Sequence, residues 1–233
     1  MREFLDSTLL GVTVGMVYAA VALGLVLIWR STRVLNFAQG AMATLTTFIA
    51  ASVLDHSVGY WAAFAIAMAA GFAVGAATER VFIRPLADRH PLDAVIVSIG
   101  LFITLEALAG TVWGPNQRGF PAPFSIASGF HLGSMPIAVT PFDLFVVAAV
   151  LVLMAVMASV FRFTGTGLRM RAAAAAPEVA ALLGVRVRSM LSLGWAVAAA
   201  CGALAGLLVA PTAYLYPGNM DIYLILGFVA AVV

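Results

Sequence analysis

Six apolar stretches of about twenty residues set the strongest limit on how this chain can fold. A helix needs about 20 consecutive apolar residues to cross a hydrocarbon core roughly 30 Å thick. The six stretches are Leu9–Trp29, Val34–Leu54, Val58–Thr78, Ala94–Trp113, Phe142–Phe161 and Met190–Ala210. A seventh, Ile222–Val233, has about half the required length and ends with the sequence. The pattern predicts an all-α, polytopic transmembrane bundle with six full spans and a truncated seventh.

The composition requires lipid as the solvent for much of this surface. Of the 233 residues, 64% are hydrophobic and only 9% are charged, whereas soluble domains carry roughly 25% charged residues. The first apolar run is too long for the core of a cleavable signal peptide, so we interpret it as a permanent span. The single cysteine, Cys201, lies in an apolar run and is expected to be a small packing residue.

The arginines predict the orientation of the chain, which contains no lysine. Ten of the twelve fall in alternate connections between the spans: Arg30, Arg33, Arg80, Arg84, Arg89, Arg162, Arg169, Arg171, Arg186 and Arg188. Only Arg2 and Arg118 lie in the other connections or at the start. Because basic loops stay in the cytoplasm, these connections are expected inside and the N-terminus outside. This one-sided pattern argues for membrane orientation and against nucleic-acid binding.

Two connections are long enough to carry function within one transmembrane domain, residues 1–233. Residues 114–141 form the predicted external loop, rich in glycine, proline and serine, which could be a lid or a docking surface. Residues 162–188 form a basic, alanine-rich loop predicted to be cytoplasmic. A polar flank would normally follow an apolar run, so the domain is expected to be incomplete at its C-terminus.

Three polar residues within the apolar stretches are candidates for a translocation pathway. Asn36 and Gln39 open the second stretch, where their spacing also fits a capping box at a helix start. Glu106 lies deep in the fourth stretch, where a charged carboxylate costs at least about 2.5 kcal/mol. It is therefore expected to be neutral, paired or facing water. Either a role in a solute path or a hydrogen-bonded carboxyl between helices would satisfy this requirement.

Three pairs of glycines are spaced four residues apart, which allows two helix backbones to approach closely in lipid. The pairs are Gly11–Gly15, Gly71–Gly75 and Gly202–Gly206. Helix packing is the plain interpretation, and a flexible, moving interface is the alternative.

The loop over 162–188 contains a short helix with a defined start and stop. Pro177 suits the first helical position, Glu178 favours the positive helix end, and Gly184 suits a left-handed cap. Val179, Ala180, Leu182 and Leu183 supply a short apolar face. A helix of about two turns is unstable alone in water. It therefore needs a partner groove on the cytoplasmic side, or else it lies on the membrane surface.

The order of several motifs resembles that in permeases of branched-chain amino acid ABC transporters. These motifs are Tyr18-Ala19, Ala22-Leu23-Gly24, Asn36-Phe37-Ala38-Gln39-Gly40, Glu79-Arg80, Arg84-Pro85 and Ser98-Ile99-Gly100. The segment from Gly167 to Val185, with Arg171-Ala172, Pro177-Glu178 and Leu182-Leu183-Gly184, is similar to the cytoplasmic coupling loop of that family. The resemblance extends over essentially the whole chain.

The resemblance implies a function and a set of partners. Such a chain is a permease subunit in the plasma (inner) membrane that pairs with a second permease, homologous or identical. Two cytoplasmic ATPase subunits bind ATP and dock on the coupling loops, and an external solute-binding protein delivers branched-chain amino acids or similar small polar solutes. On this basis the coupling residues are expected to be Arg169, Arg171, Pro177, Glu178, Leu182, Leu183 and Gly184.

Three features depart from the family pattern. Gln39 stands where many relatives have histidine, and Ala176 replaces a residue that would cap the coupling helix, at a cost of about 1 kcal/mol. Relatives also continue past Val233 with at least one more span.

The sequence argues against an enzyme. His56, His90 and His131 lie in separate loops, and no phosphate-binding loop or nucleophile–base constellation is evident. We therefore expect no metal and no cofactor in this chain, with ATP bound by its partners. An ion-coupled secondary transporter or channel is the alternative function, for which Glu106 is the only intramembrane candidate.

Overall fold

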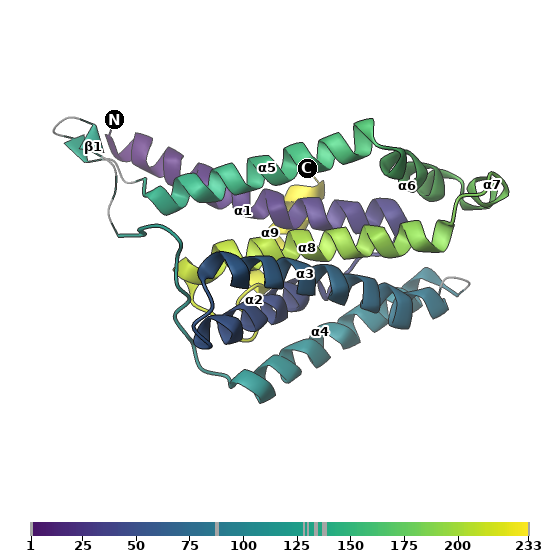
Figure 1. The fold of residues 1–233 in the computed structure, drawn as a ribbon, viewed down its shortest axis with the longest axis horizontal. Coiled ribbons are helices and arrows are strands. Elements are labelled where there is room, and N and C mark those ends of the chain that lie inside the picture. Colours follow the sequence, from purple (N-terminus) through teal and green to yellow (C-terminus); the bar gives the residue numbers. More distant parts are fainter. Residues whose placement is uncertain are drawn as a thin grey trace.

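The computed structural model is a bundle of helices and confirms the all-α fold (Figure 1). It describes residues 2–86, 89–127, 129, 131–132, 135–136 and 139–232. Five helical segments in this part are long and apolar enough to cross a membrane. Helix α2 (Gln39–Asp55), with 17 residues, is shorter than these five.

The first three spans begin and end differently from the sequence prediction. Helix α1 (Arg2–Thr32) extends the first span at both ends. Helix α2 begins only at Gln39, so the predicted start at Val34 is wrong. Helix α3 (Tyr60–Thr78) continues past its predicted end as a π-helical turn, η1 (Glu79–Ile83), and a 3-10 turn, η2 (Arg84–Leu86).

Two of the remaining spans begin with proline. Helix α4 (Pro91–Trp113) and helix α5 (Pro141–Phe163) both begin with proline, whose missing N–H costs nothing at that position. Helix α5 also has a capping box between Thr140 and Asp143. Helix α8 (Val187–Ala213) is the longest of the later helices, and Asp221–Val232 forms the short helix α9.

Helix α8 is the centre of the bundle, with α1, α2 and α3 around it (Figure 1). Its interface with α3 is built on glycine. A Cβ at Gly71 would lie 2.8 Å from Ala203 Cβ, and one at Gly75 would overlap the Trp195 carbonyl oxygen. The packing interpretation of Gly71–Gly75 and Gly202–Gly206 therefore holds. At Gly11 and Gly15 no described atom would lie within 4 Å of an added Cβ, so these two glycines make no close helix contact within the described part of this chain.

The helix ends that carry the arginines gather at one end of the bundle (Figure 1). The C-terminal ends of α1 and α5, the η1–η2 turns and the start of α8 lie there, together with α6 (Gly165–Ala175) and α7 (Pro177–Leu182). The N-terminus lies at the opposite end. The arginine-rich segments that alternate in sequence are thus neighbours in space.

The described part of the 114–141 loop folds back onto the opposite end of the bundle. Phe120 is buried and packs against Tyr60, and Arg118 pairs with Leu215 through two backbone hydrogen bonds of 2.9 Å. Strands β1 (His131–Leu132) and β2 (Met135–Pro136), of two residues each, pair in antiparallel orientation. Phe130, in the same loop, lies outside the described residues.

Candidate coupling and translocation sites

A sharp turn after α5 positions the predicted coupling segment. The Thr164 hydroxyl caps α6 by accepting a hydrogen bond from the Gly167 backbone N–H at 3.1 Å. Gly167 itself is packed against the backbone of Val160 and Phe161, where a Cβ would overlap their atoms. Only glycine permits this approach, so α6 turns away from the end of α5 and runs along the arginine-rich end.

Helix α7 starts and stops where its sequence predicts. Pro177 is at its first turn with Glu178 beside it, while Ala176 at the N-cap provides no side-chain hydrogen bond. At the other end Gly184 has a φ of +81°, which is in the left-handed region. Its N–H bonds to the Ala181 carbonyl at 3.0 Å, and the Val185 N–H bonds to the Ala180 carbonyl at 2.9 Å. These two bonds form a Schellman cap.

The apolar residues of α7 divide into one anchor and several exposed side chains. Ala180 is only 2% exposed, so the expectation that it shares one contact face with the leucines is wrong. Leu182 and Leu183 are 88% and 79% exposed, and Val179 is 55% exposed. Helix α7 lies at the tip of the molecule (Figure 1), where it contacts the bundle through Ala180 and leaves its two leucines exposed.

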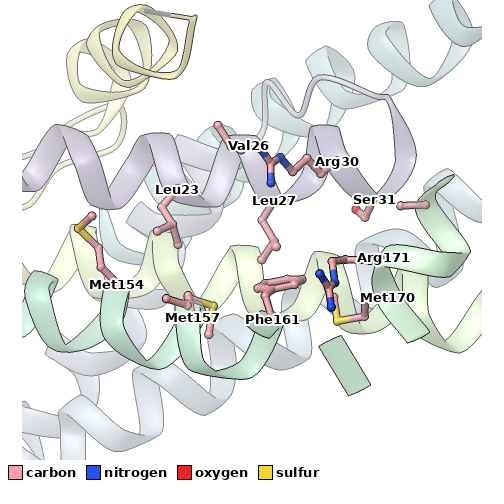
Figure 2. A pocket seen from close by; sticks show the side chains of 12 residues that line it. Leu23, Val26, Leu27, Arg30, Ser31, Met154, Met157, Phe161, Met170 and Arg171 are labelled. Atoms are coloured by element: carbon pink, nitrogen blue, oxygen red, sulfur yellow. The ribbon is translucent and has the colours of Figure 1, made fainter. Parts of the chain in front are cut away.

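The two candidate arginines of α6 serve different surfaces. Arg169 lines a hollow of about 550 Å³ together with Leu183, Gly184 and Arg186. Arg171 lines a separate pocket between α1, α5 and α6 (Figure 2). Of the predicted coupling residues, the structure thus brings Arg169, Leu183 and Gly184 together and places Arg171 elsewhere.

Asn36 and Gln39 are both buried and hydrogen-bonded to each other. The Asn36 Nδ2 donates to Gln39 Oε1 at 3.1 Å, and Gln39 Nε2 donates to the Ala198 carbonyl of α8 at 2.7 Å. Asn36 Oδ1 accepts from the Ala38 N–H at 3.0 Å, and the N-cap of α2 is Ala38 without a side-chain bond. The predicted capping box is therefore wrong, and Asn36 instead closes a turn before the helix.

Glycines on two helices make room for the Gln39 side chain. A Cβ at Gly24 of α1 would lie 2.9 Å from Gln39 Nε2, and one at Gly202 of α8 would lie 2.7 Å from it. The amide thus fits between α1 and α8 and fixes where α2 begins inside the bundle. This polar contact lies beside the buried apolar residues of α8.

Glu106 has an acidic neighbour that the sequence did not predict. Its carboxyl group and that of Asp221, in the first turn of α9, both border Gly218: a Cβ there would lie 3.0 Å from Glu106 Oε1 and 3.1 Å from Asp221 Oδ2. Two carboxyl groups can share a hydrogen bond only when one carries a proton. In the part of the chain that the structure describes, Glu106 Oε1 and Asp221 Oδ1 are buried without a hydrogen-bond partner. Among the described residues, no hydrogen bond joins Glu106 to Asn36 or Gln39.

A second polar contact lies next to this carboxyl pair. The Thr44 hydroxyl of α2 donates to Asn219 Oδ1 at 2.9 Å, and Asn219 Nδ2 donates to the Tyr214 carbonyl at 3.1 Å. Residues between α8 and α9 therefore bring polar groups into contact with α2 and α4. The signal in the sequence was the group Asn219 and Asp221 between two apolar runs.

A buried ion pair at the arginine-rich end was also missed. Glu79, 2% exposed, accepts from Arg84 at 2.8 Å and from the Ser192 hydroxyl of α8 at 2.5 Å. The intervening segment is the π-helical turn η1, whose wider turn brings residues five apart onto one face. Glu106 is therefore not the only acidic group packed among the helices. The five-residue spacing of Glu79 and Arg84 was the available signal.

No group of three or more potential metal ligands occurs among the described residues. The expected lack of a phosphate-binding loop rests on the sequence alone. The arrangement provides a helical bundle with fixed polar contacts inside and an exposed apolar tip at one end.

Comparison with known proteins identifies the family. The family model for the branched-chain amino acid transport system permease component matches residues 7–233. The high-affinity branched-chain amino acid transport system permease protein LivH of Escherichia coli K12 is 25% identical over 221 residues, covering 88% of this chain and 70% of LivH. BraD of Pseudomonas aeruginosa, with the same description, is 25% identical over 217 residues, covering 89% and 71% of the two chains.

A more distant organism has a similar relative. The probable branched-chain amino acid transport permease protein LivH of Methanocaldococcus jannaschii is 25% identical over 216 residues, covering 91% of this chain and 68% of the relative. No solved structure matches the chain. With a family model that matches nearly its whole length, this chain belongs to the family of branched-chain amino acid transport system permease components.

Proposed function

We propose that this permease subunit imports branched-chain amino acids or similar small polar solutes with energy from ATP. In this proposal two cytoplasmic ATPase subunits bind the ATP, a second permease subunit completes the path, and an external solute-binding protein delivers the solute. Family membership and the descriptions of the relatives support the solute class.

The proposed orientation has the arginine-rich end in the cytoplasm and the N-terminus outside. Six helices cross the membrane in this arrangement, namely α1, α2, α3, α4, α5 and α8. The gathering of ten arginines at one end of the bundle supports it, because basic segments remain on the cytoplasmic side.

Cysteine labelling tests the orientation. The native Cys201 is buried, so single cysteines can be introduced and labelled against a low background. Arg89→Cys should react only from the cytoplasmic side and Ile126→Cys only from outside, since both residues are exposed. Reversed labelling would contradict the orientation and the assignment of every loop.

The observation that carries the coupling proposal is the exposed pair Leu182 and Leu183 on α7. Two neighbouring leucines that are 88% and 79% exposed at a basic end of the bundle form a surface suited to a protein groove. Burial of a leucine side chain is worth about 1.5–3 kcal/mol. We therefore assign α7 as the coupling helix that an ATPase subunit binds, with Pro177 and Gly184 fixing its ends.

Charged residues add less to this contact. Arg169 borders the hollow next to Leu183, and Glu178 lies in the first turn of α7. Exposed ion pairs contribute about 0–1 kcal/mol, so these two residues are expected to orient the ATPase rather than hold it. Arg171, which lines a different pocket, is expected to contribute little to docking.

The path for the solute is proposed to pass the polar groups inside the bundle. Glu106 with Asp221 would border it from α4 and α9, and Asn36 and Gln39 would hold the start of α2 beside it. We expect Glu106 to act as a hydrogen-bonding group and not as a coupling proton site, because among the described residues no basic side chain pairs with Glu106 or Asp221. Glu106→Gln should therefore leave most ATP-dependent uptake intact, and its abolition in a well-assembled protein would contradict this role.

Co-purification with the ATPase subunit tests the coupling assignment. Leu182→Asp should weaken ATPase retention by at least about tenfold, since one buried leucine is lost and a carboxylate is placed in the groove. Leu92→Asp is the matched control, because Leu92 is 61% exposed at the arginine-rich start of α4, away from α7. Gly184→Val should act like Leu182→Asp, because a side chain at this φ strains the cap.

The outcome that rejects docking through α7 is specific. If Leu182→Asp accumulates normally in membranes and still retains the ATPase, another element must hold it. If Leu92→Asp releases the ATPase equally, the effect comes from added charge at the membrane surface and not from the α7 contact.

A further inference from the structure

An amphipathic pocket opens between α1, α5 and α6 at the arginine-rich end of the bundle (Figure 2). Its volume is about 400 Å³. Leu23, Met154 and Met157 line one end, whereas Arg30 and Arg171 line the other, with Phe161 between (Figure 2). The pocket therefore has an apolar part and a cationic part, which matches a ligand with a tail and an anionic head.

The two arginines have no counter-charge in this pocket. Among the residues that the structure describes, neither Arg30 nor Arg171 has an ion pair or a side-chain hydrogen bond to the protein. Both are exposed, and they come from different helices, Arg30 from the last turn of α1 and Arg171 from α6. Guanidinium groups bind phosphate oxygens through paired hydrogen bonds, so an anionic phosphate group complements this end.

The apolar end has the direction and exposure needed for an acyl chain. Leu23 and Arg30 are seven residues apart on α1, so the pocket extends about 10 Å along the helix from its cationic end. Met154 is 41% exposed on α5, the least buried of the five long spans. This side of the pocket is therefore open to whatever surrounds α5 in the membrane.

We propose that this pocket binds one anionic phospholipid of the surrounding leaflet, with its phosphate between Arg30 and Arg171 and an acyl chain beside Leu23 and Met157. Basic pockets between transmembrane helices at the cytoplasmic side are suited to anionic headgroups. The occupant would connect α1 with α6, the helix that leads into α7. It would thereby hold the start of the coupling segment against the bundle without contacting the solute path.

The test uses the purified permease reconstituted in nanodiscs with equal amounts of phosphatidylglycerol and phosphatidylethanolamine. After mild re-extraction, mass spectrometry counts the lipids that remain bound. The wild-type protein should retain phosphatidylglycerol in preference to phosphatidylethanolamine. The double variant Arg30→Gln with Arg171→Gln should lose this preference by roughly fivefold per arginine, as expected for the attraction of one basic residue to anionic lipid.

A matched double variant separates the pocket from the general charge of this end. Arg80→Gln with Arg89→Gln removes the same charge from exposed positions outside the pocket and should retain the preference. An equal loss in both double variants would overturn the proposal, because the lipid would then follow total charge. No retention of phosphatidylglycerol by the wild-type protein would overturn it as well.

A third variant tests the acyl chain. Ala158 lines the pocket, so Ala158→Trp should fill it and reduce bound phosphatidylglycerol while both arginines remain. If the Ala158→Trp protein elutes as a folded protein and retains as much phosphatidylglycerol as the wild type, the proposed position of the acyl chain is wrong. If the Arg30 and Arg171 variant releases the ATPase but keeps its lipid, the pocket binds a protein partner and the lipid proposal is wrong.

Discussion

Helices α5 and α8 are both long apolar helices, yet they have opposite surroundings. In the most apolar 18-residue segment of each helix, 83% of α8 is buried inside the bundle but only 11% of α5. The more buried helix is the one with the lower mean hydropathy. In lipid, hydrophobicity therefore does not decide which helix becomes the centre of the bundle, because the surrounding solvent is equally apolar.

Small residues distinguish the two helices. Helix α8 contains Gly194, Gly202 and Gly206, at which the nearest atoms of neighbouring helices would lie within about 3 Å of a built Cβ. Helix α5 contains no glycine and presents large side chains such as Leu151 and Val152 to its surroundings. Close backbone approach, which gains van der Waals contact, thus places α8 at the centre.

The largest expected effect comes from closing the α3–α8 contact. In Gly75→Leu the new side chain would meet the backbone of α8, which cannot move aside, so stability should fall by about 3 kcal/mol or more. Thermal unfolding followed by size-exclusion chromatography in detergent measures this change. Gly15→Leu is the matched control, with no described atom near its Cβ, and should change stability by less than about 0.5 kcal/mol. Equal losses would mean that close approach is not what holds α8.

Shortening a leucine side chain should lower the stability of the protein in α8 but hardly change it in α5. Leu208 is 1% exposed, so Leu208→Ala leaves a cavity that should cost about 2 kcal/mol, the lower end of the usual range because lipid replaces water as the reference solvent. Leu151 is 49% exposed on α5, and Leu151→Ala should change stability by about 0.5 kcal/mol or less. Thermal unfolding of both variants in detergent measures the two changes in stability. A larger loss at Leu151 would indicate that α5 is covered by a partner subunit.

The polar contact of α8 with α2 should have a smaller effect. Gln39→Leu removes the bond to the Ala198 carbonyl and the bond from Asn36, so the expected loss is about 1–2 kcal/mol. The control is Thr104→Val on α4, because this exposed hydroxyl bonds only to Gly100 of its own helix. The same thermal assay reports both variants. Unchanged stability in Gln39→Leu would mean that the glycines at Gly24 and Gly202 position α2 without the amide.

The smallest effect is expected at the start of α5. Its capping box joins Thr140 and Asp143 through bonds of 3.2 and 2.8 Å, so Thr140→Ala should cost about 1 kcal/mol. Thr111→Ala, which removes a hydroxyl bonded within α4, is the comparison variant. Hydrogen exchange of the first turn of α5 measures the change locally. No difference from the Thr111 variant would show that packing with α1 alone fixes this end.

Local signals in the sequence predicted the short elements well. Pro177 and Gly184 marked both ends of α7, because a missing N–H and a positive φ act within a few residues. The capping box at Asn36 was wrong because its side chain bonds within a turn and to Gln39, whose own amide reaches α8. Partners more than 100 residues away, such as Ser192 for Glu79, gave no local signal.

The sequence alone determined that this chain is an all-helical membrane protein, where its arginines cluster and which family it belongs to. These properties follow from run length, charge and motif order, which are all read along the chain. Only the tertiary structure decided that α8 is central, that Glu106 meets Asp221 and that Arg30 and Arg171 share a pocket. The physical reason is that apolar helices in lipid are equivalent until side-chain size and interhelical contacts select their neighbours.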